Sequence, residues 1–543
     1  MKRLFKIFLI IYSLLYTISA YSQSWQWAKQ IKNVCQNGPI QIMTSFSDGV
    51  NTYVLGYFTD CISIGTDTLQ SNGSSDMFIA KYNSFGDIVW VKQFGGDGSD
   101  LSSREYASGV IDTISHCIYV AGDFSGSMSL SPSIVLNGPT TFSATFLAKL
   151  DLNGNFIWGK KIGNTRNSLL YPYLHNGLLY TTGEVYDTMF IDSYLLTRGE
   201  FLARFDSVGN CLWARTVISP NTSAYIQASF IDEDIVLSGI FNRDTLNIDT
   251  ISLFGKGNYD GFLTRIDSTG KVKWAQQIGS VGFDQIGEVY IDNNKDIYFG
   301  GKFEDSLTID SILLTNTGTD LFLAKLNKDG NIFWLKQGHS TGTNNNIYRL
   351  TPFHDSEIVI TGSFNASITF GNQNMSTSYN QDMFLARFND DGLCLGADHF
   401  GEANGLCVVS DNSDGLVSIG KFNDTVTLNG IVLNSVGAVA DVFIAKHSAL
   451  TEIHETTERR NNSLLIYANP NQGICNIQVP EEFRGEKSLT LKVYGQNGAL
   501  LKIISIDPGN DDVDLTIENE AKGIYTAILS NGKKQFTGKI IFE

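Results

Sequence analysis

The stretch DLFLAKLNKDGNIFW, Asp320–Trp334, decides the fold because variants of it recur along the chain with constant internal spacing. Its phenylalanine in third position occurs in seven copies, roughly 60 residues apart, which is the signature of a repeat architecture. A cation lies three residues after each phenylalanine, and a glycine lies eight residues after the first six. The seven phenylalanines are Phe78, Phe146, Phe201, Phe262, Phe322, Phe384 and Phe443.

The other fixed positions of the repeat are charged, glycine and aromatic residues. A tryptophan lies twelve residues after the first five phenylalanines, whereas the sixth copy has Gly396 there. The cations are Lys81, Lys149, Arg204, Arg265, Lys325, Arg387 and Lys446. The glycines are Gly86, Gly154, Gly209, Gly270, Gly330 and Gly392, and the tryptophans are Trp90, Trp158, Trp213, Trp274 and Trp334.

Each unit is predicted to be a small antiparallel sheet, because it is rich in Val, Ile, Phe, Tyr and Thr and lacks a helical period. FLAKL is a strand, the following N-x-D-G is a tight turn whose glycine takes a positive φ, and NIFWLKQ is the returning strand. A further strand lies upstream of FLAKL in each unit, for example 298–303, and it ends in a sequence of the Gly-x-Phe type. A less regular segment, for example 285–291, precedes that strand. Four strands in each of seven units predict an all-β fold, a seven-bladed β-propeller.

The two ends of the repeat region complement each other. The seventh copy, 441–446, is not followed by its tryptophan strand, whereas WQWAKQ at 25–30 is such a strand without a partner, with Trp27 in the tryptophan position. We expect these halves to form one blade, which closes the ring and leaves no open sheet edge there.

The N-terminus has the pattern of a secretory signal peptide. Lys2, Arg3 and Lys6 precede an apolar run over 7–15 and small residues near Ala20 and Ser22. We therefore expect residues 1–22 to be cleaved and the propeller to span 23–447. No later stretch is long and apolar enough to cross a bilayer, which predicts no membrane insertion after cleavage.

Charge and cysteine content limit the partners. The net charge of -17 argues against nucleic acid and anionic lipid, both of which need cationic patches. The seven cysteines show no CxxC pair or zinc spacing, and their disulfide pairing cannot be derived from the sequence. Cys211 and Cys394 share one apolar position of the repeat, which predicts packed, inert thiols. No metal or cofactor motif is present, so we expect no cofactor.

A second module follows a polar linker. Residues 448–462, SALTEIHETTERRNN, lack a strand pattern and suit a linker. Residues 463–543 alternate strongly and predict a small β-sandwich. Its expected strands are 474–479, 488–494, 500–506, 512–517, 524–530 and 535–542.

The repeat, D-x-F-x-A-K-x-x-x-x-G-x-x-x-W, resembles the seven-bladed β-propeller repeats of secreted bacterial proteins, although Ala144 and Gly199 replace the leading Asp in two copies. This resemblance implies a fold and says little about the ligand.

The tail opens with Asn469, Pro470 and Gly473, has VYGQNG ending at Gly498 in its centre, and has KGIY at 522–525 near its end. With these residues it resembles the C-terminal sorting domain of type IX secretion in Bacteroidota. The resemblance implies export, recognition by the type IX secretion machinery and a secreted, extracellular or outer-membrane surface location. Ala468 departs from the commonest form, which has proline at that position. The residues that carry the resemblance are Asn469, Pro470, Gly473, Gly498, Gly523 and Tyr525.

The repeated cation allows two interpretations. The seven cations could line the channel as a basic ring that binds an anionic sugar or carboxylate. Because a feature present in every unit usually builds the scaffold, we favour cations whose stems pack between blades and whose charges pair with the Asp of the repeat. Those carboxylates are Asp76, Asp260, Asp320, Asp382 and Asp441.

Catalytic motifs are missing from the sequence. The turns 151–155 and 327–331 resemble the start of a calcium loop but lack its glutamate, so they are expected to be hairpin turns. The histidines, including His175, His339 and His399, show no paired-ligand spacing. A carbohydrate-active enzyme could still use loop carboxylates as acid and base, and the candidates are Asp97, Asp100, Glu105, Asp284 and Glu288.

Binding sites are expected in the irregular loops, since these break the symmetry of the repeat. The loops are 94–106, 164–175, 219–225 and 338–348. A recurrent Asp followed by Ser or Thr is similar to the O-glycosylation signal of Bacteroidota, although repetition of one position could explain it. The residues that would carry glycans are Thr68, Thr188, Thr245, Ser306 and Thr425.

Together, these patterns predict a surface-delivered β-propeller that binds a glycan or a protein without catalysis. A glycosidase or lyase with its site in the central funnel is the second interpretation. A structural component of the cell surface or of the gliding apparatus is the third.

Overall fold

The computed structural model contains two compact units, residues 1–451 and residues 452–543. Every regular element in the described chain is a β-strand. No helix in that part is long and apolar enough to span a membrane. The described residues are 25–35, 38–97, 107–141, 143–164, 170–218, 225–242, 245–353, 357–401, 403–411, 415–428, 430–435, 439–448, 464, 466–467, 473–480, 483, 488–494, 500–507, 512–516, 521–531 and 535–542. The predicted signal peptide, 1–22, lies outside them.

The first unit contains seven runs of four antiparallel strands in its described part. Each run follows the repeat: two strands upstream, the FLAK strand and the tryptophan strand. The runs are β2 (Ile40–Ser47), β3 (Thr52–Phe58), β6 (Asp76–Tyr82), β7 (Ile88–Gly96); β8 (Ala107–Asp112), β9 (Cys117–Phe124), β12 (Ala144–Asp151), β13 (Phe156–Asn164); β14 (Tyr171–His175), β15 (Leu178–Val185), β18 (Gly199–Phe205), β19 (Cys211–Ile218); β20 (Tyr225–Ile231), β21 (Asp234–Asn242), β24 (Tyr259–Ile266), β25 (Val272–Ile278); β26 (Gln285–Ile291), β27 (Ile297–Ile309), β28 (Ile312–Leu326), β29 (Ile332–Ser340); β30 (Asn346–Phe353), β31 (Glu357–Phe364), β34 (Asp382–Phe388), β35 (Cys394–His399); and β36 (Ala403–Ser410), β37 (Gly415–Phe422), β40 (Asp441–Ser448), β1 (Trp25–Asn33).

The last of these runs joins the two ends of the repeat region. β1 pairs antiparallel with β40, and Trp27 lies opposite Lys446 while Gln30 lies opposite Phe443. The strand pairing predicted from the sequence is therefore present, and β1 occupies the place that the tryptophan strand takes in the other six runs.

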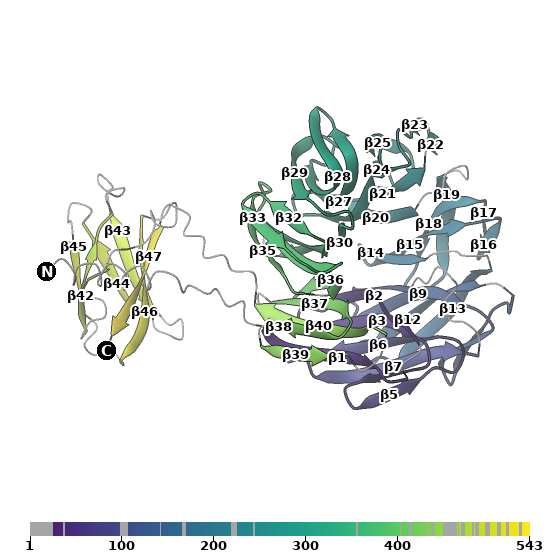
Figure 1. The fold of residues 1–543 in the computed structure, drawn as a ribbon, viewed down its shortest axis with the longest axis horizontal. Coiled ribbons are helices and arrows are strands. Elements are labelled where there is room, and N and C mark those ends of the chain that lie inside the picture. Colours follow the sequence, from purple (N-terminus) through teal and green to yellow (C-terminus); the bar gives the residue numbers. More distant parts are fainter. Residues whose placement is uncertain are drawn as a thin grey trace. The chain divides into compact units, whose positions relative to one another are not determined.

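The first strand of every run contacts the first strand of the next run. β2 contacts β8, β8 contacts β14, and the contacts continue through β20, β26, β30 and β36 back to β2. Figure 1 shows the sheets arranged around a centre, with β14, β20, β30 and β36 close to it. The innermost strands thus form a closed cycle of contacts.

The cation and the tryptophan of the repeat are cross-strand neighbours. Lys81 lies opposite Trp90, and the same pairing joins Arg265 to Trp274 and Lys325 to Trp334. The nine-residue spacing between them is what the intervening hairpin requires, because directly opposed side chains lie on one face of a sheet.

Both side chains reach the tight turn of the following sheet. The carbonyl oxygen of Leu152 accepts a hydrogen bond from Trp90 Nε1 at 3.1 Å and one from Lys81 Nζ at 3.4 Å. The carbonyl oxygen of Ser207 accepts the same two hydrogen bonds from Trp158 and Lys149. The carbonyl oxygen of Lys328 accepts them from Trp274 and Arg265. This contact between sheets recurs because the motif recurs. The indole donors and their acceptors are Trp27 to Ser84, Trp90 to Leu152, Trp158 to Ser207, Trp274 to Lys328 and Trp334 to Asp390.

Glycine is required in that turn for two reasons. Gly392 has a φ of +72°, and a Cβ atom added there would lie 2.9 Å from the Trp334 ring. A side chain would therefore be strained and would also displace the indole. The seventh sheet has no such turn, because the chain leaves after β40 and β1 comes from the other end. The sixth sheet accordingly has Gly396, opposite Arg387, where the others have tryptophan.

The partners of the repeated cations differ from the prediction. Their stems pack between sheets, but the carboxylates they contact belong to other turns: Arg265 contacts Asp234 at 2.5 Å and Lys446 contacts Asp411 at 2.5 Å. Pairing with the leading Asp of the repeat is therefore wrong for these cations. The reason is the position of the two residues in the strand. The cation lies five residues after that Asp, and its side chain points to the turn.

The leading Asp instead fixes the end of the tryptophan strand. Gln337 Nε2 donates to Asp320 at 2.6 Å, and Gln30 donates to Asp441 at 2.6 Å. The backbone N–H groups of Ser340 and Asn33 complete these sites. This explains why the motif W-x-K-Q places glutamine three residues after tryptophan.

A hairpin between the second and third strands of each run was not expected from the sequence. β10 pairs with β7, and β4 pairs with β1, so the hairpin of one sheet continues the outer edge of the preceding sheet. In the fifth run the same element is the tip of β27 and β28. Where a hairpin pairs in this way, it covers an edge that would otherwise expose unpaired backbone groups. The separate hairpins are β4 (Cys61–Ile64) and β5 (Asp67–Gln70), β10 (Ser127–Ser131) and β11 (Ile134–Asn137), β16 (Met189–Ile191) and β17 (Tyr194–Leu196), β22 (Thr245–Ile248) and β23 (Ile251–Phe254), β32 (Ser367–Phe370) and β33 (Gln373–Ser376), and β38 (Thr425–Leu428) and β39 (Ile431–Asn434).

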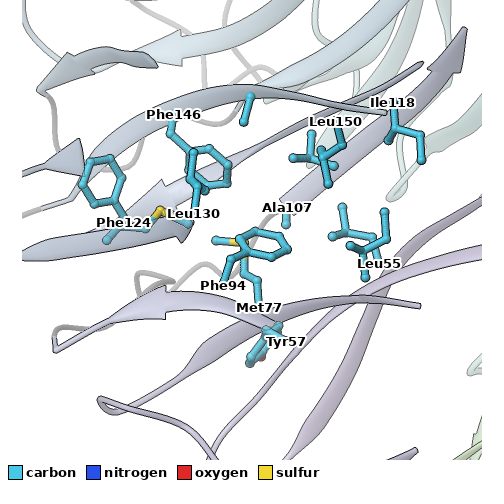
Figure 2. Close-up of a cluster of buried hydrophobic side chains, with 14 of the residues drawn as sticks. Leu55, Tyr57, Met77, Phe94, Ala107, Ile118, Phe124, Leu130, Phe146 and Leu150 are labelled. Atoms are coloured by element: carbon cyan, nitrogen blue, oxygen red, sulfur yellow. The ribbon is translucent and has the colours of Figure 1, made fainter. Parts of the chain in front are cut away.

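The core of the first unit lies between neighbouring sheets. Figure 2 shows one such layer, in which Tyr57, Met77 and Phe94 of one sheet pack toward Phe124 and Phe146 of the next. All five side chains are almost fully buried. Because both faces of a sheet are covered in this way, its strands need no alternation of apolar and polar residues.

The second unit has a three-stranded and a four-stranded sheet in its described part. Apolar side chains of both sheets, among them Ile477, Leu515, Leu491 and Ala527, form one buried cluster, as the predicted sandwich requires. The strands end within one residue of the predicted limits. They are β41 (Ile466–Tyr467), β42 (Ile474–Gln478) and β45 (Asp512–Thr516), and β43 (Leu489–Tyr494), β44 (Leu500–Ile506), β46 (Gly523–Ser530) and β47 (Gln535–Phe542).

The cysteines have different environments. Cys35 and Cys61 form a disulfide that ties the chain after β1 to β4. Cys211 is half-buried and Cys394 is buried, and burial raises the pKa of each thiol to about 12. This agrees with the prediction that these two thiols are packed and inert, because the thiolate is the reactive form.

Replacing Trp334 with alanine should destabilise the first unit by about 3 kcal/mol, because the indole contact with the next sheet is lost. The matched control is Phe333→Ala, since Phe333 is the adjacent residue and is 57% exposed. The control should change the free energy of unfolding by no more than about 0.5 kcal/mol. Urea unfolding followed by circular dichroism checks this, and equal effects of the two substitutions would contradict it.

Opening the Cys35–Cys61 disulfide should cost about 3 kcal/mol, because the bond closes a loop with a sequence separation of 26 in the unfolded chain. Urea unfolding of the full chain with and without dithiothreitol measures this cost. Cys35→Ser should reproduce the loss under oxidising conditions, whereas Cys211→Ser should remain sensitive to the reductant. Identical unfolding midpoints with and without reductant would show that the bond contributes nothing.

Candidate functional site: the central cavity

The seven innermost strands surround a cavity of about 600 Å³. Every one of them contributes lining residues, so the cavity lies at the centre of the cycle of sheets. Its volume is in the range of ligand pockets for molecules of drug size. The polar or aromatic side chains that line it are Thr44, Ser45, Ser47, Ser108, Tyr171, Tyr173, Gln227, Ser229, Glu288, Arg349, Thr351 and Ser410.

Bulges in four of the innermost strands make the cavity asymmetric. The register of β2 shifts between Ile42 and Thr44, which leaves Met43 as an extra residue. Similar shifts occur in β26, β30 and β36, whereas the pairings of β8, β14 and β20 continue without one. A bulge re-aims side chains and frees backbone groups from the ladder. In β26 the shift spans Gly287 and Glu288.

Glu288 and Arg349 are the charged residues among the described lining residues. Glu288 Oε2 accepts a hydrogen bond from the backbone N–H of Leu350 at 3.0 Å, and Arg349 Nη2 donates to the carbonyl oxygen of Met43 at 3.4 Å. Burial raises the pKa of the Glu288 carboxyl, while the Arg349 charge and the Leu350 N–H oppose that rise. Sequence reasoning named Glu288 but missed Arg349, whose position depends on the bulge in β30.

Asp284, the other candidate carboxylate of this segment, is not among the residues that line the cavity with Glu288. Asp284 lies just before β26, is almost fully buried, and accepts hydrogen bonds from the backbone N–H groups of Ser280 at 2.6 Å and Glu304 at 3.2 Å. It lies beside Asp260: a Cβ atom on Gly279 would be 2.4 Å from Asp260 Oδ1 and 2.8 Å from Asp284 Oδ2. Burial, with the charges of Asp260 and Glu304, raises the pKa of Asp284 to about 7.

The other predicted site residues lie away from the cavity lining or outside the described chain. Asp97 is exposed and accepts a hydrogen bond from the Ser127 N–H, whereas Asp100 and Glu105 lie outside the described residues. The loops 94–106, 164–175 and 219–225 are described only in part. In the fourth loop, 338–348, the buried Asn345 Nδ2 donates to the carbonyl oxygen of Thr319.

The histidines have structural contacts. His399 Nδ1 contacts Asp382 at 2.9 Å, and this hydrogen bond raises the pKa of His399. His339 contacts Asp320 at 3.3 Å, and His175 stacks on Phe230. His399 and His339 thus each contact the leading Asp of their repeat.

The calcium-like turns use their carboxylate within the turn. Asp151 Oδ1 accepts hydrogen bonds from the backbone N–H groups of Asn153 and Asn155, both at 2.9 Å. The turn at 327–331 repeats this with Asn327. These are the hairpin turns that the sequence predicts.

The Asp-Ser and Asp-Thr pairs lie in the hairpins between sheets. Asp305 and Asp424 have φ values of 63° and 55°, a conformation that Asp tolerates better than most residues. The hairpin geometry therefore gives the recurrence a structural cause. Glycosylation stays a prediction: Thr68, Thr188 and Thr425 are exposed, whereas Thr245 and Ser306 are half-buried.

The residues of the predicted sorting motif are described in part. Gly473 has a φ of +101° directly before β42, and Gly523 begins β46. The Tyr525 hydroxyl donates to the carbonyl oxygen of Ala521. Asn469, Pro470 and Gly498 lie outside the described residues.

The C-terminal unit matches a known family. Residues 465–543 match the family described as the secretion system C-terminal sorting domain. Domains of this family mark proteins that type IX secretion exports to the cell surface or the extracellular space. The chain is therefore a secreted or cell-surface protein that the type IX secretion machinery handles.

The chain also shows a low sequence similarity to a curated protein. An uncharacterised WD repeat-containing protein of Acanthamoeba polyphaga mimivirus is 23% identical over 356 residues, which are 60% of this chain and 24% of the relative. The chain thus spans about a quarter of that relative's length.

Two solved structures show weak similarity. A puromycin hydrolase has 8% identity and a TM-score of 0.36, over 81% of this chain and 58% of that one. The phage phi92 endosialidase has 10% identity and a TM-score of 0.35, over 95% and 88%. At this level of similarity no activity is carried over to the present chain.

The raised pKa of Asp284 predicts a stability that falls as pH rises. The folded state holds a proton on Asp284 up to a pKa of about 7, whereas the unfolded chain releases it near the ordinary carboxyl pKa of 3.8. The folded state therefore loses up to about 4 kcal/mol between these two pH values. Urea unfolding of the full chain from pH 4 to 8 measures the effect.

Two substitutions separate this group from the other carboxyl groups. Asp284→Asn should remove the corresponding part of the pH dependence, because no proton can bind there. Asp260→Asn should shift it to lower pH, since one charge that raises the pKa of Asp284 is gone. A pH profile that Asp284→Asn leaves unchanged would show that this carboxyl is already ionised at pH 4.

Proposed function

We propose that the first unit is a seven-bladed β-propeller, sealed by β1, which binds a ligand in its central cavity without catalysis. In this proposal residues 1–22 are the signal peptide, 23–447 the propeller, 448–462 a linker and 463–543 the sorting tail. The tail delivers the propeller to the cell surface or the medium, where it serves as a binding module for a glycan or a protein.

The observation that carries the binding role is the cavity at the centre of the seven innermost strands. It has the volume of a ligand pocket, and each of the seven innermost strands contributes at least one polar side chain to its lining. The cycle of contacts between β2, β8 and the following first strands supports the seven-bladed arrangement.

A non-enzymatic role is favoured by the carboxylates. A glycosidase of the common type needs two carboxyl groups that flank the scissile bond. The described cavity lining contains one, Glu288, and this group already accepts a hydrogen bond from Leu350 and is influenced by the Arg349 charge. Asp284, the second candidate from the same segment, is engaged with Ser280 and Glu304 instead.

A glycan array and a pull-down with the full secreted chain test this proposal. Ser108→Trp should abolish binding of any ligand found, because Ser108 lines the cavity and a tryptophan there would fill it. Ser129→Trp is the matched control, since Ser129 is exposed on β10, and it should bind as the wild type does. Circular dichroism and the thermal midpoint show that both variants fold.

Equal binding by the two variants would place the ligand outside the cavity and end the proposal. Hydrolysis of an array glycan by the wild type, lost in Glu288→Gln, would support the enzymatic interpretation instead.

A further inference from the structure

The charges of the cavity lining cancel within the described residues. One cation, Arg349, and one carboxylate, Glu288, line it, whereas the whole chain carries a net charge of -17. The neutrality is thus a property of this site and does not follow from the composition of the protein.

The two charged groups are positioned by the backbone and act on each other. Glu288 is fixed by the N–H of Leu350, the residue after Arg349, and the Arg349 charge acts on the Glu288 carboxyl. Arg349 reaches the Met43 carbonyl in β2, although its own strand, β30, is separated from β2 by β36. Its guanidinium therefore lies along the inside of the cycle.

A charged ligand would disturb this arrangement. An anion that binds Arg349 leaves the half-buried Glu288 without its compensating charge. A cation that binds Glu288 likewise leaves Arg349 without its compensating charge. Leaving one of two mutually compensating charges alone in a partly buried site is unfavourable. A ligand without net charge can instead accept from the guanidinium and donate to the carboxylate while both charges stay in place.

The remaining polar lining offers neutral donors and acceptors. Hydroxyl groups dominate it, and each hydroxyl can both donate and accept a hydrogen bond. Tyr171 and Tyr173 lie two residues apart on β14, so both side chains leave the strand on one face. They add aromatic surface with a polar end, which suits a ligand that has both apolar C–H faces and hydroxyl groups.

From these observations we infer that the cavity ligand is a neutral saccharide, held between the tyrosine pair and the Glu288–Arg349 pair. This inference rests on the proposed binding function and adds the chemical class of its ligand. The balanced charge pair selects against uronic acids, amino sugars with a free amine and charged peptides. Glu288 and Arg349 are specificity-determining residues in this assignment.

Isothermal titration calorimetry with the full chain tests the ligand class. The neutral probes are cellobiose, maltose and lactose, followed by any neutral oligosaccharide positive on the array. The charged probes are digalacturonic acid, the glucosamine disaccharide and a lysine-containing dipeptide. At least one neutral saccharide should bind at least tenfold more tightly than every charged probe.

Charge variants provide the sharper test. Glu288→Gln leaves Arg349 uncompensated and should raise the affinity for digalacturonic acid at least tenfold. Arg349→Gln should raise the affinity for the glucosamine disaccharide in the same way. The double variant has no charge and should return to the preference for the neutral saccharide.

The outcomes distinguish this inference from the proposed function. Tighter binding of a charged probe by the wild type, or an unchanged preference in both folded single variants, overturns the neutral-saccharide assignment. So does an array on which no neutral saccharide binds. If a peptide or protein then binds and Ser108→Trp abolishes that binding, the binding function stands and only the ligand class is wrong. If Ser108→Trp binds neutral saccharides normally, both proposals fail.

Discussion

The contact between a tryptophan and the glycine turn of the following sheet is the constraint on which the first unit depends. An isolated four-stranded sheet of this size exposes two apolar faces and is stable only when other sheets cover both. The indole of Trp90 and the amine of Lys81 donate to the same carbonyl, Leu152, and so fix the distance and rotation between two sheets. Since this contact recurs between most neighbouring sheets, each one determines the position of the next sheet.

This constraint explains the one irregularity of the motif. Gly396 replaces tryptophan in the sixth copy, and the seventh sheet is the one whose turn is missing because its strands come from opposite ends of the chain. A tryptophan there would have no glycine turn to cover. Trp25 instead packs against Phe400 and His447, so an aromatic contact of a different kind occupies this junction.

The regular parts of the fold could be predicted because they depend on local spacing. The nine-residue spacing from Lys325 to Trp334 sets a hairpin register. The segments 25–30 and 441–446 each have half of the motif, and their pairing could therefore be predicted. The strands of the tail follow from alternation for the same reason. The hairpins such as β16 and β17 were missed because strands of three residues carry too little pattern to be distinguished from loops.

The partners of the repeated cations were predicted wrongly for a related reason. A strand pattern shows which residues share a face, but it does not show which turn lies next to them. Lys446 and Asp411 are far apart in the sequence, and only the stacking of β36 to β40 within one sheet brings them to 2.5 Å. Pairing with Asp441 was the simplest choice within the repeat, but that carboxylate is already taken by Gln30 and Asn33.

The candidate site was the least predictable part because it arises where the repeat fails. Glu288 and Arg349 lie at bulges in β26 and β30, and a bulge is one extra residue that no spacing rule of the motif contains. In the strands without a shift, β8, β14 and β20, the lining carries hydroxyl, amide and small side chains. The symmetric residues thus hold the sheets in place, while the chemistry of the cavity is concentrated in the strands whose register departs from that symmetry. The bulge in β2 also frees the Met43 carbonyl, which accepts the hydrogen bond from Arg349 of β30. Departures from the repeat thus supply both the charged group and the backbone atom that positions it.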